Sequence, residues 1–390
     1  MTRTSATFSP PIPEAYRWLD GVEFAKDRPL MNVSQAAPVD PPPRALREAL
    51  AQAVLDDPAA HLYGPVLGLP ALRAELAGRI QRLYGGAVTA ADVAITAGCN
   101  EAFAATMASL TAEGDEVILP TPWYFNHKMW LDMAGVRAVP LPTGADLLPD
   151  PQAAAALIGP RTRAIVLVSP NNPAGVEYPP ALLRALYDLA KSRGIALVVD
   201  ETYRDFHASD GAPHDLFTDP DWRKTLIHLY SFSKAYRLTG HRVGALVTDP
   251  ARLAQIEKFL DTVTICPAQV GQIGALWGLR NLDDWLAGER LEVLARRAAM
   301  AEGFSALADR GWGLAGLGAY FAYVSHPFDM GAQDVARRLV SEAGILLLPA
   351  TMFVPETDDG HGARHLRIAF ANLDRPGIAA FFSRLSGLSF

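Results

Sequence analysis

The chain has 390 residues, half of them apolar, which suffices for a large α/β domain with a smaller domain attached. Its 42 acidic and 35 basic residues give a formal net charge of −7, so the composition gives no support for nucleic acid or an anionic membrane as a partner. The two cysteines, Cys99 and Cys266, lie far apart in the sequence and form neither a disulfide framework nor a metal-ligand spacing.

The first 43 residues form a proline-rich segment that lacks an apolar core of the secretory type. No apolar run later in the chain approaches the length of a bilayer span, so we expect a cytoplasmic protein without membrane contact. The segment ends in Pro41-Pro42-Pro43, and we expect no regular helix before Arg44. This segment is typical of an arm, and residues 1–45 are predicted to form the arm and part of the smaller domain.

Two helices are predicted next, over residues 44–54 and 70–83, because leucine, isoleucine and valine recur there at helical spacing. The loop between them contains Tyr63, in the run His61-Leu-Tyr-Gly-Pro-Val-Leu-Gly68.

From Asp92 onward, short apolar runs alternate with helical segments. Parallel strands need crossover helices, so this alternation predicts a mostly parallel sheet covered on both faces, in a large domain over residues 46–285. The predicted strands cover residues 93–96, 116–119, 136–140, 164–168, 195–199, 225–230 and 243–248. The predicted helices include one ending at 110, one starting at 123, a short alanine-rich one within 146–159, and those over 180–193 and 251–260.

Polar and aromatic residues stand where these strands end. Gly98, Cys99 and Asn100 open a helix whose free backbone N–H groups would face an anion. A reactive catalytic Cys99 is the alternative interpretation of that corner. Trp123 and Tyr124 follow the next strand, and an aromatic face there would fix the plane of a ring ligand. Core packing explains Trp123 equally well.

Two more polar groups follow the next two strands. Asn172 supplies an amide in a stiff turn, Asn172-Pro173. Asp200 puts a carboxylate at the end of an apolar strand, where ligands of open α/β sheets bind, and Tyr203 comes three residues later.

Lys234 follows the strand predicted over residues 225–230. A lysine at the end of a core strand is partly desolvated, which lowers its pKa and makes a neutral amine available to condense with a carbonyl. Ser231, Ser233 and Arg242 are donors suited to phosphate oxygens. An amine nucleophile beside a phosphate clamp indicates pyridoxal phosphate, although a solvated loop after a strand would explain the stretch taken alone.

A second domain is predicted over residues 286–390, after a connecting helix over 285–307. Its pattern is α+β, with strands at 320–325, 345–348 and 365–370, a helix at 332–343 and a terminal helix. Arg367 lies in the last strand. It is a candidate to bind a carboxylate with its planar charged fork, and a surface ion pair is the alternative. Neighbouring Arg364 is a weaker candidate.

Together, Asn172-Pro173, Asp200-x-x-Tyr203 and Ser231-x-x-Lys234 with Arg242 resemble the class I/II aminotransferases, which are fold-type I pyridoxal-phosphate enzymes. The order and spacing match over essentially the whole chain. The resemblance implies a three-layer α/β fold with a mostly parallel sheet, a smaller α+β domain, and a homodimer with active sites at the subunit interface. It also implies transfer of an amino group from an L-amino acid, neutral or aromatic by preference, to a 2-oxo acid through a Schiff base on Lys234.

The resemblance further assigns roles to individual residues. Lys234, Asp200 and Tyr203 would be catalytic, with Asp200 keeping the pyridine nitrogen protonated. Arg367, Asn172 and Ala36 would bind the substrate. The cofactor pyridoxal 5′-phosphate would be held by Gly98, Cys99, Asn100, Tyr124, Asn172, Asp200, Tyr203, Ser231, Ser233, Lys234, Arg242 and, from the neighbouring subunit, Tyr63.

Two departures from the family pattern are visible. His241 stands where relatives often carry an apolar or aromatic residue. The stretch Gln35-Ala36-Ala37-Pro38 stands where many relatives have a glycine over the substrate. The second leaves the side-chain pocket, and hence the specificity, open.

Two rival functions remain. A carbon–sulfur β-lyase, or another amino-acid lyase, would use the same residues on the same scaffold and would release pyruvate and ammonia without an oxo acid. A non-catalytic sensing module fused to a DNA-binding domain is disfavoured, because no basic helix-turn-helix precedes the scaffold and Lys234 is intact.

Overall fold

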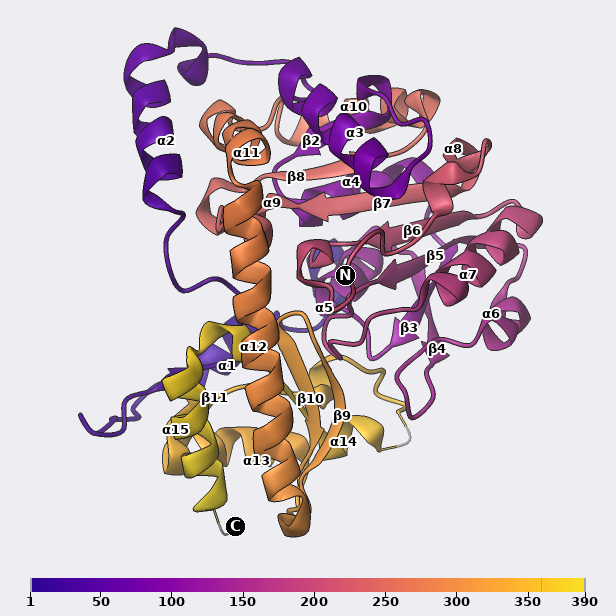
Figure 1. Cartoon of the computed structure of the whole chain (residues 1–390). Helices are drawn as coiled ribbons and strands as arrows, with labels where there is room; N and C mark the ends of the chain where they lie inside the picture. The colour runs from indigo at the N-terminus through magenta and orange to yellow at the C-terminus, as the bar shows by residue number, and fades with distance from the viewer. Residues whose placement is uncertain (1, 359, 389–390) are drawn as a thin grey trace.

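The computed structural model of the chain, described over residues 2–358 and 360–388, is built around a seven-stranded sheet (Figure 1). β8 is antiparallel to both of its neighbours, and the other neighbouring strands are parallel. In spatial order the strands are β2 (Val93–Thr96), β8 (Gly244–Val247), β7 (Leu226–Ser231), β6 (Ala196–Asp200), β5 (Thr162–Val168), β3 (Glu116–Thr121) and β4 (Arg137–Pro142).

Helices cover both faces of this sheet because alternate residues of its buried strands point to opposite sides. In β6, Val198 packs in one apolar cluster while Leu197 and Val199 pack in another. The Val198 face is covered by α4 (Cys99–Leu110), α5 (Phe125–Ala134) and α10 (Pro250–Val263). The opposite face is covered by α2 (Arg44–Asp56), α3 (Pro70–Tyr84), α6 (Pro151–Leu157), α7 (Pro180–Arg193) and α11 (Gln269–Asn281).

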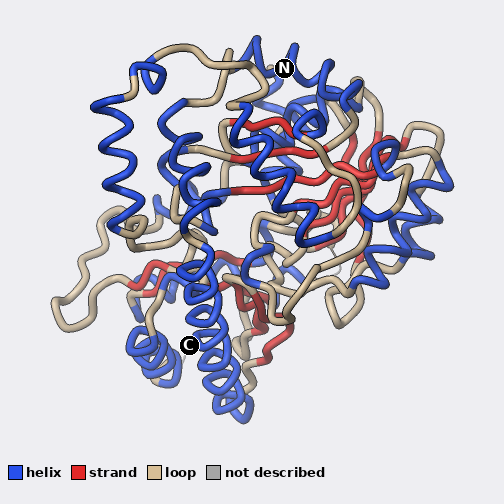
Figure 2. Tube along the Cα trace, turned by 45° about the horizontal axis from the view of Figure 1, so that its top comes forward, coloured by secondary structure: helices blue, strands red, loops and turns tan. Residues whose placement is uncertain are grey.

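A four-stranded antiparallel sheet lies apart from the first, as the two groups of strands in Figure 2 show. Its order is β12 (Leu348–Pro349), β13 (His365–Ile368), β10 (Phe321–Ser325) and β9 (Gly313–Gly318). The long helix α12 (Asp283–Leu307) runs from the region of α11 down to this sheet (Figure 1). Together with α13 (Ala332–Arg338) and α15 (Arg375–Ser386), it buries a separate apolar core.

The amino-terminal segment joins this smaller sheet region. β1 (Met31–Asn32) pairs in parallel with β11 (Ile345–Leu346). The prediction of no helix before Arg44 is wrong, because α1 spans Pro11–Arg17. Its two prolines occupy the first turn, where backbone N–H groups have no partner within the helix and their loss costs little.

Three other elements differ from the sequence predictions. Helix α11 was not expected, because its glycines interrupt the helical spacing of apolar residues. Gly274 and Gly278 leave room for Leu50 and Tyr236, which pack where side chains at these two positions would lie. β9 is likewise an unpredicted strand that contains three glycines. The strand predicted over 345–348 is divided between β11 and β12, which pair with different partners.

The boundaries of further elements shift slightly. The helix expected from residue 123 begins at Phe125. The helix expected over 332–343 is an α-helix only to Arg338 and continues as a π-helix, Leu339–Ala343.

The predicted fold class is confirmed: a mostly parallel sheet covered by helices, with a smaller α+β unit attached. The domain boundaries at residues 45 and 285 stay predictions. Among residues 2–358 and 360–388, no helix combines the length and apolarity needed to cross a bilayer.

Candidate active site

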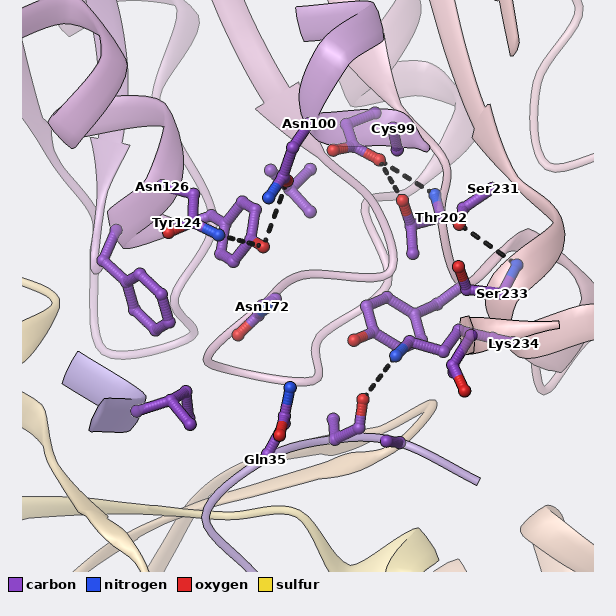
Figure 3. A pocket seen from close by; sticks show the side chains of 18 of the residues that line it. Gln35, Cys99, Asn100, Tyr124, Asn126, Asn172, Thr202, Ser231, Ser233 and Lys234 are labelled. Carbon is purple, nitrogen blue, oxygen red and sulfur yellow. Dashed lines mark hydrogen bonds between the residues drawn. The ribbon is translucent and has the colours of Figure 1, made fainter. Parts of the chain in front are cut away.

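A cavity of about 410 Å³ lies at the carboxyl ends of β5, β6 and β7, where ligands of open α/β sheets bind (Figure 3). The start of α4 borders it on one side. Residues 35–37 and Arg367 of β13 close it from the side of the smaller sheet. The cavity therefore draws its lining from segments more than three hundred residues apart in sequence.

Lys234 lies in α9 (Phe232–Ala235), directly after β7, and its amine donates a hydrogen bond to the carbonyl oxygen of Ala36. Burial, reinforced by the positive charges of Arg242 and Arg367, lowers the pKa of Lys234 to about 7. A substantial fraction of this amine is therefore neutral, and nucleophilic, at physiological pH.

Gly98 and Arg242 form a cationic corner at the start of α4. Gly98 has a φ of +89°, and a β-carbon on it would lie 2.3 Å from an Nη atom of Arg242, so only glycine lets the guanidinium approach the helix end. Arg242 donates to the Ser233 hydroxyl at 3.4 Å and to the carbonyl of Thr239 at 2.9 Å. Guanidinium, hydroxyl and helix N-terminus together make an anion site.

Ser231, Cys99 and Asn100 complete this corner, and all three line the cavity. The Ser231 hydroxyl accepts the backbone N–H of Ser233 at 3.3 Å, which fixes the turn between β7 and α9 (Figure 3). Burial raises the pKa of the Cys99 thiol well above its ordinary value. A buried protonated thiol is a poor nucleophile, so the geometry favours a structural Cys99 over a reactive one.

Asp200 ends β6 and is 3% exposed. Oδ1 of Asp200 accepts hydrogen bonds from the backbone N–H of Thr202 at 3.0 Å and from the Thr202 hydroxyl at 2.7 Å. Oδ2 of Asp200 lies 3.3 Å from Nε2 of His127. Burial alone would raise the pKa of Asp200, but the hydrogen bonds from His127 and Thr202 outweigh it and lower that pKa. The carboxylate is therefore held as an anion inside the protein.

Arg367 is 2% exposed and lies between the rings of Phe321 and Phe353, at 5.1 Å and 4.9 Å. It donates to Oδ1 of Asn172 at 2.9 Å and to the carbonyl oxygen of Ser34. Its Nε has no hydrogen-bond partner in the described part of the chain. Burial lowers the pKa of Arg367 to about 10, which leaves it charged at neutral pH. A surface ion pair, the alternative interpretation, does not fit this burial.

Two tyrosines line the cavity beside these groups. Tyr203 packs its ring 5.1 Å from that of Phe321, and burial raises the pKa of its hydroxyl, which stays protonated. Tyr124 accepts a hydrogen bond from the amide of Asn126 at 2.8 Å and donates to Asn100 at 3.4 Å (Figure 3). Burial raises the pKa of Tyr124 to about 12. Trp123 is buried away from this cavity, as the packing interpretation expects.

Tyr63, which the sequence assigned to the cofactor of a neighbouring subunit, lies away from the cavity of its own chain. Its side chain is 81% exposed and borders a separate hollow near Cys266 and Gln269. Arg364, the weaker candidate for the carboxylate, is exposed and also lies outside the cavity. The others line the cavity, except Gly98, whose place at the cationic corner is described above.

Several lining residues were not found from the sequence: Ile12, Gln35, Phe125, Asn126 and Thr202, together with His127 behind Asp200. Thr202 had a local signal, since an aspartate followed two residues later by threonine suits a side-chain-capped turn. His127 had none, because its contact with Asp200 joins α5 to β6 across the fold.

These residues fit pyridoxal 5′-phosphate. Arg242, the serines and the end of α4 suit a phosphate, the anionic Asp200 suits a protonated ring nitrogen, and Lys234 suits an aldehyde. The described residues contain no cluster of three metal-ligating side chains.

Comparisons with known proteins agree with this geometry. Residues 28–385 match the family model described as aminotransferase class I and II. The chain is 32% identical over 364 residues to the arginine–pyruvate transaminase AruH of Pseudomonas aeruginosa, covering 90% of this chain and 88% of that protein. It is 28% identical over 357 residues to the aromatic aminotransferase ISS1 of Arabidopsis thaliana, covering 88% and 86%. The structure of an aspartate aminotransferase mutant from Thermus thermophilus superposes with a TM-score of 0.87 at 25% identity, covering 99% and 98%.

Proposed function

The chain belongs to the class I and II aminotransferases, pyridoxal-phosphate enzymes, and from this premise we propose that it moves the amino group of a neutral or aromatic L-amino acid to a 2-oxo acid. The observation that carries the proposal is the position of Lys234. Its amine, with a pKa of about 7, lies in the same cavity as the cationic corner at Arg242, which suits a phosphate, and as Arg367, which suits a carboxylate.

The residues that would hold the cofactor follow from their chemistry. Lys234 would carry it through a Schiff base, with Arg242, Ser231, Ser233 and the amino-terminal end of α4 on its phosphate. Asp200 would keep a proton on the ring nitrogen, and Asn172 and Tyr203 would hydrogen-bond the phenolic oxygen. The bound cofactor withdraws electron density from the substrate Cα.

The amine of Lys234 is then the group that moves a proton at the substrate Cα. General acid–base catalysis is most effective when the pKa lies near the working pH, and burial brings Lys234 there. Arg367 would hold the α-carboxylate and so orient the Cα–H bond. Two of the five N–H groups of Arg367 donate to Asn172 and Ser34, which leaves donor capacity for a ligand.

The proposed substrate class rests on the remaining walls of the cavity. Ile12 of α1 and Phe125 of α5 offer apolar surface, and Gln35 and Asn126 offer neutral amides. Among the described lining residues the cations are Lys234, Arg242 and Arg367, each already assigned, so none is left for a second carboxylate. A neutral or aromatic side chain suits these walls better than an acidic one.

A homodimer is part of the same proposal. Leu62 and Tyr63 are exposed apolar side chains, at 66% and 81%, and they lie beside a hollow of about 560 Å³. Contact with a second subunit would bury this surface and could bring Tyr63 to the neighbour's phosphate corner.

A half-reaction screen tests the proposal. The cofactor-loaded enzyme is mixed with single amino acids, without an oxo acid, and the visible absorbance of the cofactor is followed. We expect phenylalanine, tyrosine and methionine to bleach it rapidly, and aspartate and glutamate to do so slowly. Bleaching by the acidic amino acids alone would overturn the substrate class. Steady release of pyruvate and ammonia from a thioether amino acid, without an oxo acid, would show a lyase instead.

A further inference from the structure

A second cavity, of about 370 Å³, lies outside the active site. It is formed by the end of α3, the segment that follows β6 and the first third of α12. Within the described part of the chain, it shares no lining residue with the active-site cavity. Nothing in the proposed transamination makes use of it.

Four arginines converge on this cavity from the three elements: Arg79 and Arg82 from α3, Arg204 from the segment after β6, and Arg290 from α12. Three aspartates also line it, so guanidinium groups exceed carboxylates by one. A cavity with such an excess of forked donors favours an oxyanion.

The three aspartates are each engaged by one of the arginines. Asp283 pairs with Arg79, Asp210 pairs with Arg290 at 2.7 Å, and Asp205 lies 3.3 Å from Arg204. The carboxylate of Asp205 also accepts the hydroxyl of Tyr230 at 2.8 Å. These pairings leave Arg82 as the arginine without an aspartate partner among the described lining residues.

Arg82 is held weakly. Its ion pair in the described structure, with Glu75, has an N–O distance of 3.6 Å, and Arg280 lies closer to that same carboxylate, at 3.2 Å. The Arg82 side chain is 65% exposed at the rim of the cavity and is free to turn toward a ligand.

Behind these ion pairs, the buried wall of the cavity contains polar atoms that have almost no accessible surface. Arg204 is 3% exposed, and its Nε and Nη1 have no hydrogen-bond partner among the described residues. His207 is 6% exposed; its Nδ1 lies 3.2 Å from Glu177, and its Nε2 lacks a partner within residues 2–358 and 360–388. These atoms are covered by protein, and the guanidinium of Arg204 lies over the ring of Tyr230, at 4.1 Å. Arg204 therefore contributes its positive charge to the cavity rather than a free donor.

We propose that this cavity is a binding site for a small oxyanion, either a phosphate group or a pair of carboxylates, held by Arg82 at the rim with the positive charge of Arg204 in the wall behind it. The segment that carries the site is continuous with the active site. Asp200 and Tyr203 line the first cavity, while Arg204 and Asp205, the next residues, line the second.

Calorimetric titration of the cofactor-loaded enzyme tests this site, since the cofactor then fills the phosphate corner at Arg242. Inorganic phosphate and succinate are titrated separately at constant ionic strength, with chloride as the reference anion. The test variant is Arg82→Glu. The matched control is Arg193→Glu, the same charge reversal at an exposed arginine in the last turn of α7.

We expect saturable binding of at least one of the two anions, weakened at least about tenfold by Arg82→Glu and changed less than about twofold by Arg193→Glu. Phosphate binding with this pattern identifies a phosphate-bearing ligand. Succinate can also bind at Arg367 in the active site. The succinate titration is therefore judged by the difference in affinity between wild type and Arg82→Glu, and weaker binding by Arg82→Glu identifies a dicarboxylate ligand. Binding of neither anion above chloride, or equal binding by wild type and Arg82→Glu, would overturn the proposal.

Discussion

Replacement of Arg367 by glutamine removes the charge and the fork that we assign to the substrate carboxylate. The side chain is almost fully buried, and its neighbours Asn172 and Ser34 fix its position. Glutamine keeps a polar group near Asn172, so the change acts mainly on the ligand. Arg364→Gln is the matched control, because Arg364 lies three residues earlier, is exposed, and donates to the carbonyl of Phe328.

The size of the effect follows from the bonds lost. A hydrogen bond to a charged group contributes about 1.5–3 kcal/mol, so a fork of two such bonds contributes about 3–6 kcal/mol. Each 1.4 kcal/mol corresponds to about a factor of ten, so kcat/KM should fall roughly 10²- to 10⁴-fold. Arg364→Gln should stay within about threefold of wild type, since exposed polar contacts contribute little.

The assay compares an amino acid with its amide, which lacks the charged carboxylate. Wild type should prefer the acid strongly, and Arg367→Gln should lose most of that preference while its cofactor absorbance spectrum stays unchanged. An Arg367→Gln enzyme that keeps the full preference for the acid would refute the assignment of Arg367.

Three other predictions follow from the site. Because burial lowers the folded-state pKa of Lys234 to about 7, the unfolded chain binds one more proton than the folded chain between pH 7 and the ordinary lysine pKa. Relative to Lys234→Met, the wild-type apoprotein should therefore gain about 1.4 kcal/mol of unfolding free energy per pH unit in urea titrations from pH 7.5 to 9.5, and a flat difference would contradict the lowered pKa. His127→Leu should raise the pKa of Asp200 and lower kcat roughly 10- to 100-fold, with partial recovery in His127→Gln, whose amide can still donate; equal rates in both variants would exclude a positioning role. Ile12→Arg should raise kcat/KM for glutamate at least about tenfold relative to phenylalanine, and an unchanged ratio would show that Ile12 lies away from the substrate side chain.

Much of the large sheet and its site could be predicted from sequence because the signals are local. Asp200 ends the apolar strand β6, and Lys234 lies in the short helix that directly follows β7. Parallel strands bring such ends together at one edge of the sheet. The structure places both side chains in one cavity with Asn172, Arg242 and Arg367.

What could not be predicted depends on contacts between distant segments. Ile12 lines the cavity because α1 forms in a proline-rich stretch, where the prolines happen to fall in the first turn. His127 reaches Asp200 from a neighbouring helix. The glycines of α11 are needed for close packing on Leu50 and Tyr236. Because glycine carries no apolar side chain, the helical spacing of apolar residues is interrupted there and the sequence does not predict the helix.

The central claim is a covalent bond between Lys234 and the cofactor aldehyde, and peptide mapping after borohydride reduction tests it most directly. The reconstituted enzyme is reduced, digested and analysed by mass spectrometry. We predict a reduced pyridoxyl-phosphate group on the peptide that contains Lys234, and none in Lys234→Ala. Reduction that leaves this peptide unmodified, or that labels a different lysine, would contradict the account.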